Sequence, residues 1–210
     1  MTSIGSGAMI RTGDKVGYEG ALYSLQQLAG LSVHLGGKSA LTVQGRAHYL
    51  DLNVQRLYLF CEKHGTLPSW FMTYDWGYKI RAVYTSFLPY NVGLISIPHK
   101  TFTLKVASPE RAILECLYLT PKVHSLIECY EVLEGMNNLR PKQVQFLLEK
   151  CTSVKVKRLF LYMAEKANHR WLDYVDTDRI DLGSGKRAFV KEGGVYNSRY
   201  KITVPKELEA

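Results

Sequence analysis

The segment Ser108-Pro109-Glu110-Arg111-Ala112 marks the point at which the chain changes from a strand pattern to a helix pattern. Ser108 can cap a helix, Pro109 fits its first turn, and Glu110 lies at the positive end of the helix dipole. The chain before this point has runs of β-branched and aromatic residues, whereas the chain after it carries apolar residues at helical spacing. The segment therefore predicts an α+β fold that divides near residue 107.

The half before this segment begins with helical spacing and continues as strands. Apolar residues at steps of three and four predict a helix from residue 18 to 29, with Gly30 as its C-cap. A short strand over 31–35 and a short helix over 38–44 follow. Runs bounded by Pro and Gly predict further strands over 56–60, 79–84, 92–97 and 101–106. We expect these strands to form a mostly antiparallel sheet with flanking helices.

The half after this segment is predicted to be helical and to close with a C-terminal β-hairpin. Apolar spacing indicates a helix up to Pro121, a second over 123–133, and two more that start at Pro141 and near Ser153. Strands over 186–191 and 195–204 flank Glu192-Gly193-Gly194, which we interpret as the turn of the hairpin. We expect three parts: 1–14 as the remnant of an N-terminal wing or a flexible tail, 15–107 as a mixed α/β subdomain, and 108–210 as a helical subdomain.

The composition is that of a globular protein with an excess of positive charge. Its 210 residues are 46% hydrophobic and 22% charged, which excludes wholesale disorder. No apolar run approaches the roughly eighteen residues of a membrane span, and the first residues do not resemble a secretory leader, so we expect a cytoplasmic protein with no membrane partner. Lysine and arginine number 27 against 19 acidic residues. This net charge of +8 favours nucleic acid as a partner, and an acidic protein after it.

The cysteines do not indicate a metal site. No CxxC pair occurs among Cys61, Cys116, Cys129 and Cys151, so a zinc ribbon or finger is not expected. Cys116 and Cys129 fall within apolar helical patterns, where a buried thiol acts as a small hydrophobe. We therefore expect no metal and no cofactor.

The fragment Gly36-Gly37-Lys38-Ser39 lies between a predicted strand and a predicted helix, as a phosphate-binding loop would. A Walker A motif needs another glycine five positions before the glycine of its GKS triplet, and Ser32 stands there. We interpret the glycines as a turn that lets the backbone enter the helix tightly. Such a turn could still hold one phosphate of a nucleic acid on its N–H groups.

Histidines and lysines near this turn leave an enzymatic alternative open. His34, Lys38, Arg46 and His48 lie within fifteen residues of sequence, and a ribonuclease can use two histidines and a lysine. A strand followed by a helix points such residues in different directions, so the sequence does not fix their mutual geometry. A nucleic-acid-processing enzyme that uses His34, Lys38 and His48 is the alternative to a non-enzymatic protein, which we favour.

The helix after Ser153 carries the sharpest binding signal. At about 100° per residue, its cations and one tyrosine fall on one arc beside an apolar stripe. Such an arc suits a phosphate-backbone surface, although a solvated basic face would have the same pattern. The C-terminal hairpin offers a second basic patch, with protection of a sheet edge as its structural alternative. The predicted nucleic-acid-binding residues are Lys155, Arg158, Tyr162, Lys166, Lys186, Arg187, Lys38 and Arg46.

Seven blocks of sequence carry a resemblance that covers nearly the whole chain from Lys15 to Pro205. The blocks are GALYSLQ (20–26), VHLGGKSAL (33–41), QGRAHYL (44–50), SPERA (108–112), NLRP (138–141), VKVKRLF (154–160) and LGSGKR (182–187). In their order and spacing they resemble the AbiEi family. The members of this family are abortive-infection antitoxins of type IV toxin–antitoxin systems.

The resemblance implies a bacterial cytoplasmic protein with an N-terminal winged helix-turn-helix and a larger C-terminal antitoxin domain. Family members repress their own operon by binding operator DNA, and they counteract a cognate nucleotidyltransferase-type toxin without a stable complex. Only fourteen residues precede Lys15 here, so residues 2–11 would correspond to the end of the wing. We therefore expect the chain to lack most of the winged helix-turn-helix, which weakens the expectation of operator binding. A third hypothesis, a pure protein-interaction domain, predicts no nucleic-acid binding even at low salt.

Overall fold

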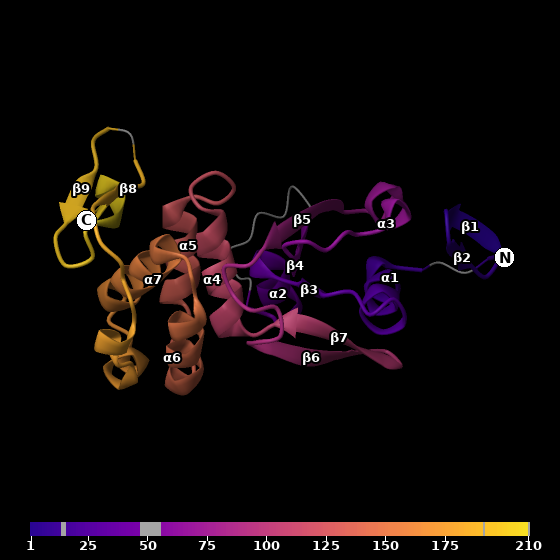
Figure 1. Cartoon of the computed structure of the whole chain (residues 1–210), viewed down its shortest axis with the longest axis horizontal. Coiled ribbons are helices and arrows are strands. Elements are labelled where there is room, and N and C mark those ends of the chain that lie inside the picture. The colour runs from indigo at the N-terminus through magenta and orange to yellow at the C-terminus, as the bar shows by residue number, and fades with distance from the viewer. Residues whose placement is uncertain (14–15, 47–55, 191, 210) are drawn as a thin grey trace.

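The computed structural model describes residues 1–13, 16–46, 56–190 and 192–209. The molecule is elongated, with the N-terminal strands and the C-terminal strands at opposite ends of its long axis (Figure 1). Strands dominate the first half of the chain and helices the second, with a small sheet at the C-terminus. The predicted α+β class is confirmed.

The first residues form a hairpin of β1 (Thr2–Gly5) and β2 (Ala8–Ile10). The hairpin contacts the short helix α3 (Ser69–Thr73) through Gly5. A Cβ atom on Gly5 would lie 2.3 Å from the Cβ of Trp70, and Gly5 has a φ of +151°, so this contact requires glycine. The first residues therefore form a paired hairpin that packs on α3.

A five-stranded sheet lies next to the hairpin, with the strand order β5-β4-β3-β7-β6. Its strands are β3 (Val33–Leu35), β4 (Arg56–Glu62), β5 (Lys79–Thr85), β6 (Leu94–His99) and β7 (Phe102–Ala107). The pairs β3–β4 and β6–β7 are antiparallel, whereas β4–β5 and β3–β7 are parallel. The sheet is thus mixed rather than mostly antiparallel, because the connection from β4 through α3 is long enough to return β5 in the same direction.

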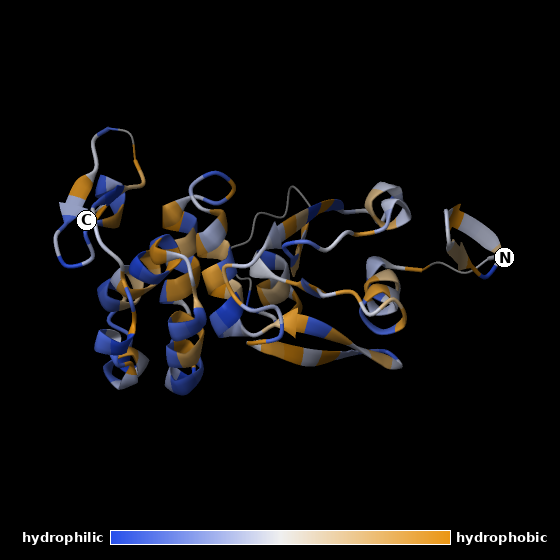
Figure 2. Cartoon of the chain, viewed as in Figure 1, coloured by the Kyte–Doolittle hydropathy of each residue, from blue (hydrophilic) through white to orange (hydrophobic). Residues whose placement is uncertain are grey.

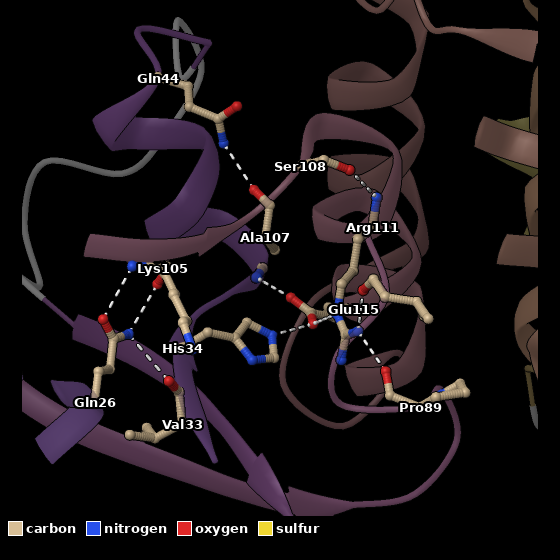
Figure 3. Close-up of polar contacts among 12 residues, drawn as sticks. Gln26, Val33, His34, Gln44, Pro89, Lys105, Ala107, Ser108, Arg111 and Glu115 are labelled. Carbon is tan, nitrogen blue, oxygen red and sulfur yellow. Dashed lines mark hydrogen bonds and ion pairs between the residues drawn. The ribbon is translucent and has the colours of Figure 1, made fainter. Parts of the chain in front are cut away.

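Strands β3 and β7 pair directly only between Leu35 and Val106. Next to this pair, the side chain of Gln26 bridges the two strands by hydrogen bonds to their backbones. Gln26 lies in a π-helical turn (Ser24–Leu28) that continues α1 (Tyr18–Tyr23), and its side chain is buried. Its Nε2 donates to the carbonyls of Val33 at 3.0 Å and Lys105 at 2.9 Å, and its Oε1 accepts from the amide of Lys105 at 2.9 Å (Figure 3). The amide of Gln26 therefore takes the place of a backbone segment between the two strands.

Helix α4 (Pro109–Leu119) is the centre of the molecule. It begins as predicted, with Pro109 in the first turn and Ser108 Oγ accepting from the amide of Arg111. Nearly all of its residues are buried, because it packs against β7, α2 (Gly37–Val43) and three other helices. These are α5 (Leu126–Glu134), α6 (Pro141–Lys150) and α7 (Val154–Lys166), whose residues alternate between hydrophilic and hydrophobic along each helix (Figure 2).

The C-terminal strands form a three-stranded sheet with the order β8-β10-β9. Its strands are β8 (Arg187–Ala188), β9 (Val195–Asn197) and β10 (Ile202–Val204). The predicted hairpin turn at Glu192-Gly193-Gly194 is wrong, because β10 lies between β8 and β9 and pairs antiparallel with β9 and parallel with β8. Short 3₁₀ turns at Arg170–Tyr174, Thr177–Arg179 and Lys206–Leu208 complete the described elements. No helix in the described ranges is long and apolar enough to cross a membrane.

Replacing Gln26 with leucine is expected to lower the free energy of unfolding by about 2–4 kcal/mol, because it leaves buried backbone groups of Val33 and Lys105 without partners. Urea unfolding of the purified chain measures this loss. Gln27→Leu, at the exposed neighbouring position, is the matched control and should change the stability by less than about 0.5 kcal/mol. Equal stability of the two variants would contradict the role given to Gln26.

Candidate functional site

A fully buried carboxylate lies where the sheet meets the helices. Glu115, on α4, is 0% exposed and accepts hydrogen bonds from three separate elements (Figure 3). Its Oε1 lies 2.7 Å from His34 Nε2 on β3 and 2.7 Å from Arg111 Nε on its own helix. Its Oε2 accepts from the amide of Gly37, at the start of α2, at 2.8 Å. The carboxylate therefore joins the strand, the glycine turn and the central helix.

The glycine turn makes this arrangement possible. A Cβ atom on Gly36 would lie 2.3 Å from Glu115 Oε2 and 2.5 Å from a ring carbon of Phe60, so no larger residue fits. Gly37 has a φ of +51°, a left-handed conformation that glycine adopts without strain. The anion that this turn binds through the amide of Gly37 is the protein's own Glu115. Entry of the backbone into the helix, rather than a Walker A loop, is the function of these glycines.

The electrostatics of the network favour a charged carboxylate. Burial alone would raise the pKa of Glu115, but His34 and Arg111 outweigh it and hold the pKa below its ordinary value. Arg111, itself buried, also donates to the carbonyls of Pro89 and Val92. Each member of the network thus has partners that compensate for its removal from water.

A cavity of about 250 Å³ borders this network. His34 lines it together with polar residues of β6, β7 and the loop that precedes β6: Tyr90, Asn91, Ser96 and Lys105. The His34 side chain is itself only 4% exposed, because its ring lies between Glu115 and Phe60. The imidazole therefore forms part of the cavity wall while its Nε2 is held by the buried carboxylate.

The two described residues of the enzymatic alternative are paired with different carboxylates. His34 is bound to Glu115, whereas Lys38 forms an ion pair with Glu128 on α5. His48 lies outside the described residues. The same part of the chain contains no group of three side chains that could hold a metal ion.

The basic arc predicted on α7 is formed, but it faces the protein rather than solvent. Arg158 is only 1% exposed, and its guanidinium donates to the carbonyls of Leu182 at 2.8 Å, Gly183 at 3.0 Å and Gly185 at 2.7 Å. The segment between the 3₁₀ turn Thr177–Arg179 and β8 therefore folds over this helix face. The expectation that Arg158 lies on an open phosphate-binding surface is wrong for this reason.

The other members of that arc also have partners within the chain. Lys155 Nζ donates to the carbonyls of Tyr118 at 2.6 Å and Thr120 at 2.7 Å, and burial lowers its pKa to about 8. Tyr162 is buried, and its hydroxyl donates to Glu209 Oε1 at 2.9 Å and lies 3.2 Å from the carbonyl oxygen of Leu208. Lys166 Nζ lies 5.7 Å from the ring centroid of Tyr130 and is partly buried. The arc is thus largely an internal surface that holds the C-terminal part of the chain.

The remaining predicted binding residues differ in their exposure. Lys186 and Arg187 are exposed at the C-terminal sheet, and Lys186 Nζ lies 5.0 Å from the ring centroid of Tyr196. Arg46 is partly buried and donates to Asn138 Oδ1 at 3.0 Å. Lys38 is partly buried at its ion pair with Glu128. Of the predicted set, Lys186 and Arg187 are the residues best placed to meet a partner.

The burial of the Glu115 network was not predicted from the sequence. The i,i+4 spacing of Arg111 and Glu115 allows an ion pair along the helix, and the structure contains this pair in a buried position. The signal for burial was the run of apolar residues on every side of this helix, Ala112-Ile113-Leu114 and Cys116-Leu117. A helix that is apolar all round is buried, so its charged residues require partners from other elements.

Glu115→Gln is expected to lower the free energy of unfolding by about 3 kcal/mol at neutral pH, because an amide leaves Arg111 buried without a counter-charge. The lowered pKa of Glu115 means that the carboxylate stabilises the fold above the unfolded value of about 4.3 and that this stabilisation is lost as the pH falls through the folded value.

The difference between wild type and variant should therefore shrink below about pH 4 in urea unfolding measured across pH. Glu131→Gln, at an exposed position of α5, is the control and should have little effect. A difference that stays constant into the acid range would show that the charge of Glu115 is not what stabilises the network.

Comparison with known proteins identifies two matching family models. The model described as "Transcriptional regulator, AbiEi antitoxin, Type IV TA system" matches residues 54–205, and the AbiEi antitoxin N-terminal domain model matches residues 1–52. The second match overturns the expectation that the chain lacks most of the N-terminal winged helix-turn-helix, because the N-terminal domain of the family is present. The two matched regions share one sheet, because β3 from the first region pairs with β4 and β7 from the second.

A solved structure has a similar fold. The crystal structure of RV2827C protein from Mycobacterium tuberculosis superposes with a TM-score of 0.59 at 12% sequence identity, and the match covers 86% of this chain and 64% of that one. At this identity the likeness concerns the fold alone. No curated protein matches the chain. On the two family-model matches, the chain belongs to the AbiEi family of transcriptional regulators and antitoxins of type IV toxin–antitoxin systems.

Proposed function

We propose that this protein is the antitoxin and autoregulator of a bacterial type IV toxin–antitoxin pair and counteracts a nucleotidyltransferase-type toxin in the cytoplasm. The observation that carries this proposal is the match of AbiEi models to residues 1–52 and 54–205. In a type IV pair the antitoxin opposes the effect of the toxin without a stable complex. We therefore expect functional antagonism rather than co-purification.

We further propose that the protein contacts DNA through phosphates, with the exposed side chains of Lys186 and Arg187 at its C-terminal end. Lys186 lies over the ring of Tyr196, which is 42% exposed, so a cation and an aromatic face are available together. Cations of this kind bind the phosphate backbone with little sequence selectivity. Lys201, which is exposed at the turn before β10, adds a third charge to the same small sheet.

The alternative of a nucleic-acid-processing enzyme has less support. His34 is hydrogen-bonded to Glu115, and Lys38 is paired with Glu128, so each side chain already has a carboxylate as its partner. A general base and a lysine that act on one phosphate must both reach it. The cavity beside His34 is a feature that favours chemistry. A purified chain that degraded labelled RNA or DNA would revive this alternative.

Co-expression of the chain with a toxin of the same operon should restore growth of cells that the toxin arrests, because the antitoxin acts against the effect of the toxin. The tagged chain should not retain the toxin through purification. Growth that stays arrested at full expression of the chain would contradict the antitoxin role, and a stable stoichiometric complex would contradict the type IV assignment.

Reversing both Lys186 and Arg187 to glutamate should weaken DNA binding at least about tenfold at low salt and reduce the slope of log affinity against log salt by about 2, one unit for each phosphate contact. Fluorescence anisotropy with labelled duplex DNA measures both quantities. The control is the double variant Lys63→Glu, Arg170→Glu, which changes the net charge by the same amount at exposed positions outside the C-terminal sheet. It should leave the slope nearly unchanged. Equal losses in the two double variants would show that only the net charge matters.

A further inference from the structure

A buried histidine without a partner lies in the turn between α4 and α5. His124 is 2% exposed, and its Nε2 has no hydrogen-bond partner among the residues that the structure describes. Buried polar atoms in folded proteins nearly always have a partner, and leaving one unpaired is unfavourable. This nitrogen is therefore an atom whose surroundings need an explanation.

The histidine packs against one face of the five-stranded sheet, near the end at which β4 and β5 begin. Its ring lies edge-on to Tyr58, with the two ring centroids 5.0 Å apart. Tyr58 pairs in register with Arg81 on the parallel neighbour β5, and Arg56 pairs in the same way with Lys79. Side chains two residues apart on a strand lie on one face, and register partners do as well. Arg56, Lys79 and Arg81 therefore surround Tyr58 on the same face as His124.

The surroundings of His124 are positively charged. Arg56, Lys79 and Arg81 are exposed at this end of the sheet, and Lys122 is exposed in the same turn as His124. Burial, together with the charges of Lys38, Arg81 and Arg56, lowers the pKa of His124 to about 3. The carboxylate of Glu128 on α5 is already paired with Lys38. At neutral pH the ring is uncharged and keeps one N–H, which can donate to an acceptor.

We propose that His124, Arg56 and Arg81 form a binding site for a terminal phosphate group, carried by inorganic phosphate or by a nucleotide. Guanidinium groups donate to phosphate oxygens in pairs, and a terminal phosphate has enough oxygens for two arginines and an imidazole N–H. The burial of His124 favours a small molecule over a polymer, because a phosphate at the end of a ligand reaches further into the protein than one within a backbone. This site lies on the five-stranded sheet and does not depend on the DNA contact proposed for Lys186 and Arg187.

Thermal unfolding of the full chain in phosphate, compared with chloride of equal ionic strength, tests the site. Phosphate should raise the melting temperature of the wild type, because a ligand that binds only the folded state stabilises it. Arg81→Gln should weaken the phosphate affinity about tenfold, as expected for one charge-assisted hydrogen bond. In chloride, His124→Phe should have a higher melting temperature than wild type, because it removes the unpaired Nε2 atom. In phosphate, the melting temperature of this variant should not rise further. Lys63→Gln, at the opposite end of β4, is the control and should respond as wild type.

A second readout is the titration of His124 followed by NMR. Bound phosphate should raise the pKa of His124, because an anion stabilises the charged ring. Titration with ATP and with an oligonucleotide that lacks terminal phosphates separates the sources: competition by ATP assigns the site to nucleotides, whereas binding of inorganic phosphate without competition by ATP restricts it to the free ion. The proposal is overturned if phosphate stabilises wild type and His124→Phe equally, if the histidine signal does not respond, or if the oligonucleotide alone shifts it.

Discussion

The rest of the structure depends on the neutralisation of one carboxylate that no water reaches. Glu115 is 0% exposed, and a charge taken out of water destabilises a fold unless other groups replace its hydration. The replacements come from β3 through His34, from α2 through the amide of Gly37, and from α4 through Arg111. These three elements must therefore meet at one point. Satisfying Glu115 fixes the position of the sheet against the central helix.

The same rule holds at two other places where distant segments meet. Gln26 donates to and accepts from the backbones of β3 and β7, and Arg158 donates to carbonyls of the segment from Leu182 to Gly185. In each case a buried polar side chain forms hydrogen bonds with backbone groups that have no partner in regular secondary structure. The molecule thus uses polar side chains, in addition to apolar packing, to hold irregular segments against its regular ones.

This use of polar residues explains what could be predicted from the sequence and what could not. Local patterns located the elements well: the Ser108 cap, the strand over 102–107 and the four helices of the second half all follow from spacing and capping. Strand order depends on contacts between distant residues, so the parallel pairs β4–β5 and β3–β7 were not predicted. A helical projection likewise groups Lys155, Arg158 and Tyr162 correctly. It cannot show that Lys155 bonds to the end of α4, or that Arg158 and Tyr162 bond to segments near the C-terminus. The exposure of these side chains was therefore harder to predict than the helix that carries them.

The network also bears on how the two family regions relate to each other. Strand β3, from the N-terminal region, lies between β4 and β7 of the second region and supplies His34 to Glu115. Without it, both neighbouring strands would lose a partner, and a buried carboxylate would lose the donors on β3 and α2. The N-terminal region is therefore part of the hydrogen-bonded core of the second rather than a module joined to it by a linker. A change in either region that displaced β3 would therefore break the contact between His34 and Glu115 on the central helix.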